Sequence, residues 1–190
     1  MKQQIRKEKN ALRRALDPQI LKEKSEHICQ RIMALESYKR ANVIMAYQAM
    51  GGEVSLDCLI RDALEKGKRL GFPLCLSKTE MEARVPFGEK AYKRGAFGIW
   101  EPDEKASAPL EAEEIELVIV PCVAFDEHCR RLGMGGGYYD RYLPKCRRAW
   151  LMAAAFELQK VPQVPVEAHD RCMDQIITEE RAYGEGQLVF

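Results

Sequence analysis

Short apolar runs recur along the chain, and segments with the spacing of one helix face lie between them. The strongest run covers residues 117–125; others cover 43–50, 69–76, 83–87 and 150–156. Apolar runs of this length are typical of strands buried on both faces of a sheet. Because helical segments at 55–66 and 137–146 alternate with these runs, we expect an α/β protein. Its predicted architecture is three-layer α/β/α with a mostly parallel sheet.

Two N-terminal helices are predicted before the first strand. Residues 2–16 carry six Lys and Arg residues against one acid, Glu8, and Ile5, Leu12 and Leu16 share a stripe. Asp17 followed by Pro18 is typical of a helix start. Four apolar residues then recur on one helix face: Leu21, Ile28, Ile32 and Leu35. We expect residues 1–190 to form a single α/β domain, with the helical segment 1–40 packed on it.

Two further segments lack a strong pattern. Residues 101–116 hold seven acids and two prolines, so we expect a solvated connection there. Beyond residue 161, prolines at 162 and 165 favour extended structure.

Composition excludes several classes of protein. The net charge of +1 gives no global field that would attract nucleic acid or a membrane. The apolar runs are shorter than the roughly 20 residues that span a bilayer, and residues 1–6 lack the apolar stretch of a secretory signal. Seven cysteines without a Cys-x-x-Cys pair favour reduced thiols over disulfides or zinc. We therefore expect a cytoplasmic protein without a nucleic-acid or membrane partner.

A glycine-rich segment between Arg131 and Asp140 carries the clearest chemical signal. Four glycines, at 133, 135, 136 and 137, follow a predicted strand and precede a predicted helix. Glycines let backbone N–H groups approach a ligand, a helix N-terminus favours an anion, and a guanidinium suits phosphate. The spacing matches neither a P-loop nor a dinucleotide-binding fingerprint. The residues alone thus predict an anion-binding site.

The same segment resembles the signature of the 5-formyltetrahydrofolate cyclo-ligase family. The resemblance rests on the run from Arg131 to Asp140, preceded by Val-Ala-Phe-Asp at 123–126. It extends to further motifs in the family's order: Lys2 and Arg6, Gly-Glu-Val at 52–54, Gly-Ile-Trp-Glu-Pro at 98–102, Val-Pro at 164–165 and His-Asp at 169–170. It implies a monomeric enzyme that uses ATP and Mg²⁺ to convert 5-formyltetrahydrofolate into 5,10-methenyltetrahydrofolate, releasing ADP and phosphate.

The resemblance also implies a role for each matching residue. Lys2, Arg6 and Arg131 would act as the catalytic cations. ATP would contact Lys2, Arg6, Arg131, Leu132, Gly133, Met134, Gly135, Gly136, Gly137, Tyr138 and Tyr139. The folate would contact Glu53, Met134, Trp100 and Tyr138. Among these, the Glu53 carboxylate can accept paired hydrogen bonds from a pterin ring. Asp140 and Asp170 would hold the magnesium, which prefers oxygen ligands.

Structural alternatives stay open for several of these residues. Tyr138 and Tyr139 suit the core side of the predicted helix, and Asp140 suits its first turn. Phe97 and Trp100 suit either a folate pocket or the core. Arg13 and Arg14 match no motif and are expected to be surface charges.

Three departures from the family pattern weaken the substrate assignments. The segment Phe72-Pro73-Leu74-Cys75 lacks the basic and aromatic residues that some members carry after that proline. Cys129 stands where the family often has glycine, so a positive φ there would be strained. Met134 stands where a basic residue is frequent. Two other functions compete: an isomerase or CoA-transferase relative that binds a substrate phosphate, and a nucleic-acid-binding protein with a basic helix.

Overall fold

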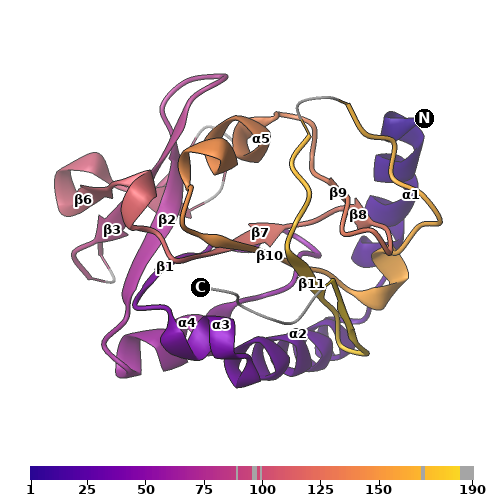
Figure 1. Cartoon of the computed structure of the whole chain (residues 1–190), viewed down its shortest axis with the longest axis horizontal. Coiled ribbons are helices and arrows are strands. Elements are labelled where there is room, and N and C mark those ends of the chain that lie inside the picture. The colour runs from indigo at the N-terminus through magenta and orange to yellow at the C-terminus, as the bar shows by residue number, and fades with distance from the viewer. Residues whose placement is uncertain (89, 96–97, 99, 168–169, 185–190) are drawn as a thin grey trace.

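The structure is a computed structural model that describes the chain except residues 89, 96–97, 99, 168–169 and 185–190 (Figure 1). Its helices are α1 (Lys2–Arg14), α2 (Pro18–Ala34), α3 (Glu36–Arg40), α4 (Asp57–Glu65) and α5 (Tyr138–Tyr142), with 3₁₀ turns at Glu104–Ala106, Ala112–Glu114, Leu143–Lys145 and Glu157–Gln159. Its strands are β1 (Val43–Met45), β2 (Arg69–Cys75), β3 (Met81–Pro86), β4 (Tyr92–Arg94), β5 (Trp100–Pro102), β6 (Ser107–Leu110), β7 (Leu117–Pro121), β8 (Ala124–Phe125), β9 (Arg131–Leu132), β10 (Trp150–Ala154), β11 (Gln175–Ile177) and β12 (Ala182–Tyr183).

The main sheet has the order β12-β11-β10-β7-β1-β2-β3-β6. The five strands from β11 to β2 run parallel, and β12, β3 and β6 pair antiparallel at the two edges. Helices α2, α3 and α4 lie on one face of the sheet, and α5 lies on the other (Figure 1). The predicted three-layer α/β/α fold with a mostly parallel sheet is therefore confirmed.

Strand β7 shows why the chain folds into layers. Leu117 and Ile119 pack into the core beneath α2 and α4, whereas Val118 and Val120 pack into the core on the opposite face, and all four are buried. Successive side chains of a strand point to opposite faces, so an uninterrupted apolar run buries both.

The N-terminal helices begin much as predicted. The Asp17 carboxylate accepts hydrogen bonds from the N–H groups of Gln19 and Ile20, and Pro18 occupies the first turn of α2. Helix α1 lies apart from α2, at the end of the molecule beside β8 and β9 (Figure 1). Among the helices of the described residues, none is both long and apolar enough to cross a bilayer.

Several predicted boundaries were wrong. The run 43–50 forms a strand only at Val43–Met45. The next residues, Ala46 and Tyr47, are buried but belong to no strand. The run 117–125 is split, since residues 122–123 turn between β7 and β8. The predicted helix 137–146 is one short α-helix followed by a 3₁₀ turn that contains Pro144.

The expectation of a solvated connection at 101–116 was also wrong. Strand β6 pairs with β3 at the edge of the sheet, and Leu110 and Glu101 are buried. Ser107 and Leu110 of this strand are buried, and all seven acids of the segment lie outside it.

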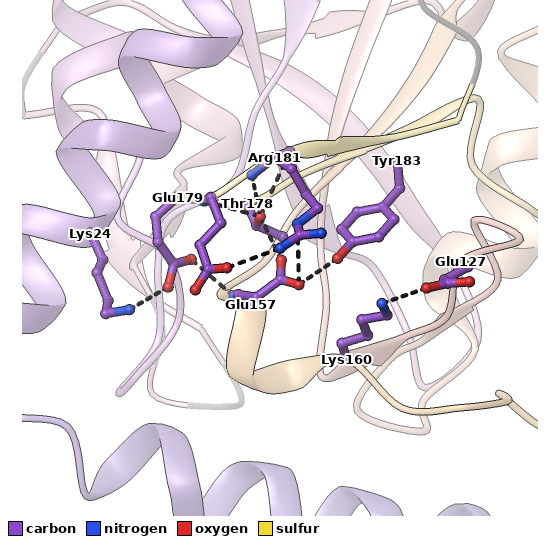
Figure 2. A network of polar contacts seen from close by, with 9 residues as sticks. Lys24, Glu127, Glu157, Lys160, Thr178, Glu179, Arg181 and Tyr183 are labelled. Atoms are coloured by element: carbon purple, nitrogen blue, oxygen red, sulfur yellow. Dashed lines mark hydrogen bonds and ion pairs between the residues drawn. The ribbon is translucent and has the colours of Figure 1, made fainter.

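A polar network fixes the C-terminal strands to the rest of the fold (Figure 2). Lys24 of α2 pairs with Glu179, whose carboxylate also accepts from the N–H of Glu157. The Glu157 carboxylate accepts in turn from the hydroxyls of Thr178, at 2.8 Å, and Tyr183. These bonds join α2, the end of β10 and the turn between β11 and β12.

The central position of β7 predicts a large stability effect. Ile119 is fully buried, so Ile119→Ala should reduce the free energy of unfolding by about 2–5 kcal/mol, through lost burial and the cavity left behind. Leu64 on α4 is 60% exposed, and Leu64→Ala should change the free energy of unfolding by less than about 0.5 kcal/mol. Urea denaturation of both variants measures the difference; equal losses would contradict the assigned core.

Candidate active site

The candidate active site is a cleft at the point in the sheet where the order of the strands along the chain changes direction. From β1 the chain passes to β2 on one side and later to β7 on the other. In open α/β sheets, ligands bind at the carboxyl ends of the strands beside such a reversal. A cleft of about 610 Å³ opens there, lined by residues that follow β1, residues that follow β7, the second half of β2, the glycine-rich segment and α1.

Every site residue proposed from the sequence that the structure describes lines this cleft. They are Lys2, Arg6, Glu53, Trp100, Arg131, Leu132, Gly133, Met134, Gly135, Gly136, Gly137, Tyr138, Tyr139, Asp140 and Asp170. Trp100 and Met134 are about half exposed, which places them near its mouth. Phe97 lies outside the described residues.

Arg131 is anchored rather than mobile. Its guanidinium donates to the Pro121 carbonyl at 3.2 Å and to the Asp140 carboxylate at 3.0 Å. It also lies 5.6 Å from the centre of the Tyr139 ring, and the residue is 7% exposed. Arg131 thus fixes the end of β7, the orientation of Asp140 and the start of the glycine-rich segment together.

The glycines leave room for arginine side chains. A Cβ on Gly133 would lie 2.8 Å from Nη1 of Arg131, and one on Gly135 would lie 3.2 Å from Cζ of Arg6. Gly135 also has φ +106°, which residues with a Cβ rarely adopt. The Arg6 Nε donates to the Gly133 carbonyl at 2.8 Å, so α1 holds the segment from outside.

The N–H groups of this segment remain available to a ligand. Among the described residues, none of the N–H groups of residues 133–137 donates to a backbone or side-chain acceptor of the chain. Together with Lys2 and Arg6, these N–H groups form a surface suited to an anion.

Helix α5 is shorter than predicted, and hydrogen bonds tie it to the turn after β2. The Tyr138 hydroxyl donates to the Ser77 carbonyl at 2.9 Å, and Arg141 donates to the Thr79 carbonyl at 2.7 Å. Tyr138 and Tyr139 both line the cleft and pack against the core. The predicted positions of these tyrosines, in the ligand site and on the core side of the helix, are therefore compatible. Asp140 likewise lies in the first turn of α5 and also lines the cleft.

The two proposed metal ligands each pair with a cation. Asp140 accepts from Arg131, and Asp170 accepts from Lys2 at 2.8 Å and from the N–H of Glu167. The hydrogen bond to Asp170 raises the pKa of Lys2. Within the described ranges no group of three or more His, Cys, Asp or Glu side chains could enclose a metal. A metal here would need ligands from a bound substrate, which is usual for Mg²⁺ with phosphates.

Glu53 is a buried carboxylate that also lines the cleft, and it is 7% exposed. It accepts from the N–H of Met50 at 2.9 Å, within a tight turn in which its own N–H donates to the Met50 carbonyl. Burial raises its pKa, while the Met50 N–H and the charge of Arg13 act in the opposite direction.

The placement of Arg13 on the surface was wrong. Arg13 is 3% exposed and donates to the Cys122 carbonyl at 3.0 Å, whereas Arg14 is exposed. Lys2, Arg6, Lys9 and Arg13 are spaced by four, three and four residues, so they share one face of α1. That basic face points into the protein, while Leu12 of the apolar stripe is 45% exposed. The spacing was the signal that could have identified Arg13.

Asp126 supports the hairpin that leads to Arg131, a role that the motif did not reveal. It is fully buried and accepts from the N–H groups of His128, Arg130 and Val164. Within this hairpin Cys129 has φ +57°, the left-handed conformation in which strain was expected.

Comparison with known proteins agrees with this geometry. The sequence profile described as the "5-formyltetrahydrofolate cyclo-ligase family" matches residues 1–179. The chain belongs to this family. It is 32% identical to a protein of Schizosaccharomyces pombe named as a probable 5-formyltetrahydrofolate cyclo-ligase, over 95% of this chain and 96% of that one. It is 30% identical to the 5-formyltetrahydrofolate cyclo-ligase of Haemophilus influenzae, over 89% and 92%.

A solved structure is similar over the whole length. The 5,10-methenyltetrahydrofolate synthetase of Aquifex aeolicus superposes with a TM-score of 0.85 at 29% identity, covering 100% of this chain and 96% of that one. The resemblance read from the sequence is therefore confirmed, as is the expectation of an enzyme of this family.

The environment of Glu53 predicts a pH-dependent stability effect. A carboxyl group whose pKa is raised by folding binds more protons in the folded state, so it destabilises the fold increasingly as the pH rises through that pKa. Glu53→Gln should therefore increase the free energy of unfolding at neutral pH, and the gain should shrink as the pH falls through the pKa of Glu53 in the folded protein. Urea denaturation across this pH range measures it.

Glu65→Gln, at an exposed position of α4, is the matched control. It should neither increase the free energy of unfolding at neutral pH nor change how that free energy depends on pH. A pH-independent effect of Glu53→Gln would contradict the assigned burial.

Proposed function

We propose that the protein catalyses the ATP- and Mg²⁺-dependent cyclisation of 5-formyltetrahydrofolate to 5,10-methenyltetrahydrofolate. The observation that carries the proposal is that two unlike sets of groups line one cleft. Uncommitted N–H groups and two cations form the first set, which we assign to one end of the cleft, and a buried carboxylate is the second, which we assign to the other end. Membership of the cyclo-ligase family and the names of its relatives support the same substrates.

The first end suits a triphosphate. Lys2 and Arg6 lie one turn apart on α1, and Arg6 already contacts the glycine-rich segment. The N–H groups of residues 133–137 can donate to phosphate oxygens without losing bonds within the described chain. Arg131, held beneath them, supplies positive charge and orients Asp140.

The second end suits a pterin ring. As an anion, Glu53 can accept two hydrogen bonds from the adjacent N–H groups of such a ring. Trp100, Met134 and Tyr138 line the same cleft, and their apolar and aromatic surface can cover the rest of the folate.

The residues present fit a magnesium ion held jointly with the nucleotide. Asp140 and Asp170 supply two carboxylates on the phosphate side of the cleft, and the remaining ligands would be phosphate oxygens and water. When bound, Mg²⁺ would offset negative charge on the phosphate oxygens.

The chemistry requires activation of a poor electrophile. The formyl group is an amide, so transfer of the γ-phosphoryl group to its oxygen breaks the bond to ADP and makes that oxygen a phosphate leaving group. N10 then bonds to the formyl carbon and loses its proton to solvent, and the C–O bond breaks with its electron pair on the departing phosphate. The protein contributes by alignment and by stabilising charge.

No cysteine in the cleft is needed as a nucleophile. The thiol of Cys75 lines the cleft, but burial and the neighbouring Glu101 raise its pKa to about 11, so it stays protonated at neutral pH.

Product release tests the proposal directly. The purified protein should release ADP and phosphate in equal amounts with the methenyl product, and only when ATP, Mg²⁺ and 5-formyltetrahydrofolate are all present. Coupled detection of ADP and phosphate, with each component omitted in turn, measures this requirement. Folded protein that hydrolyses ATP without the folate, or that turns over neither substrate, would contradict the proposal.

Arg6 should contribute mainly to ATP binding. Arg6→Met removes one charge-assisted donor, worth about 1.5–3 kcal/mol, so the KM for ATP should rise by roughly 10- to 100-fold. Lys7→Met removes a neighbouring charge that is exposed, and should leave the KM for ATP nearly unchanged. Steady-state kinetics of the two variants decides; equal effects would assign the contribution to the net charge of α1 rather than to contact.

A further inference from the structure

Arg13 is buried without taking part in the proposed contacts with either substrate. Its Nη1 donates to the Cys122 carbonyl at 3.0 Å and its Nη2 to Asn10 Oδ1 at 2.7 Å. Gln159 donates to the same Cys122 carbonyl at 2.6 Å. Arg13 therefore fastens the C-terminal half of α1 to the chain that leaves β7, one residue beyond the carbonyl that Arg131 holds.

The turn that carries Glu53 packs directly against Arg13. Gly52 has φ +81°, and a Cβ there would lie 3.4 Å from backbone and Cβ atoms of Arg13. Glu53 follows at once and closes the turn through Met50. Both charged residues are more than nine-tenths buried, so their interaction is only weakly screened by solvent.

The groups around Glu53 come from four elements. Tyr47 follows β1, Tyr139 belongs to α5, Cys122 follows β7 and Arg13 belongs to α1. Burial raises the pKa of each of the two phenols and of the thiol, so these three groups are neutral near pH 7. Arg131 contacts the Tyr139 ring and, like Arg13, opposes the raised pKa of Cys122. Arg13 is the cation that acts on Glu53 itself.

We propose that Arg13 is a positioning residue that serves both ends of the cleft: it fixes the helix bearing Lys2 and Arg6, and its charge keeps Glu53 an anion able to accept hydrogen bonds from the substrate. The proposal rests on the proposed function, since it assigns the pterin ring to Glu53. A purely structural arginine would anchor α1 but would not influence how folate affinity depends on pH.

Two substitutions separate anchoring from charge. Arg13→Gln and Arg13→Lys both retain a hydrogen-bond donor for the Cys122 carbonyl, but only the lysine retains the charge. In Arg13→Gln the opposing charge is lost, so the pKa of Glu53 should rise further and the carboxyl group should bind a proton at higher pH.

The readout is the Kd of 5-formyltetrahydrofolate, measured by calorimetry without ATP from about pH 6 to about pH 9. As the pH is lowered, the folate affinity of Arg13→Gln should begin to fall at a higher pH than that of the wild type. Below the pKa of Glu53 the loss should be roughly tenfold per pH unit. Arg13→Lys should keep the wild-type profile, as should Arg14→Met, which removes an exposed charge from the same helix. A wild-type profile in Arg13→Gln would overturn the proposal.

The double variant Arg13→Gln/Glu53→Gln completes the test. It should bind folate weakly at every pH, because the titrating carboxyl group is gone. If Arg13→Gln fails to fold, the double variant should fold, since the buried carboxylate that lost its opposing charge is removed as well. Failure of both variants to fold would overturn the charge role. Failure of the wild type to make product would instead contradict the proposed function.

Discussion

The docking of α1 through its basic face determines most of the site. Arg6, Lys9 and Arg13 each donate to a backbone carbonyl of another segment: Gly133, Leu158 and Cys122. Cations buried in this way are stable only where oxygen atoms replace lost water, and carbonyls at the ends of strands and turns supply such atoms. The helix is thereby tied to three separate segments. Because Lys2 and Arg6 reach the cleft from that helix, the phosphate end depends on these bonds.

The topology of the sheet explains why the remaining parts meet. The chain that leaves β1 and the chain that leaves β7 diverge at the reversal of strand order, and residues of both line the cleft. Arg131 then holds the end of β7 while its own segment supplies the glycines. The glycine-rich segment is therefore fixed to the end of β7 by the Arg131 side chain before any substrate binds. Such preorganisation is what phosphoryl transfer requires, since catalysis there consists of alignment and charge.

The sequence predicted the layers and the cleft residues well because both depend on local signals. Two-sided burial gives β7 its apolar run, and backbone approach gives the segment 133–137 its glycines. The rest depends on partners remote in sequence. The spacing of Arg13 places it on the basic face of α1, but the partner that buries it, the Cys122 carbonyl, lies 109 residues away in the sequence. The edge strand β6 is only four residues long and lies between acidic residues, so its pairing with β3 has no local signal. The role of Asp126 likewise depends on N–H groups of the hairpin that follows it, and residue propensities do not predict that hairpin.

The ion pairs in the cleft bear on which form of nucleotide it would accept. Lys2 pairs with Asp170 and Glu167, and Arg131 pairs with Asp140. A free triphosphate could recruit Lys2 only in competition with Asp170 and Glu167, and Arg131 only in competition with Asp140. A free metal ion would compete with the same cations for these carboxylates. Either exchange carries a desolvation penalty. A complex of metal and triphosphate provides a partner for both signs at once. On the proposed function, the charge pattern of this cleft therefore favours the magnesium complex of ATP over either component alone.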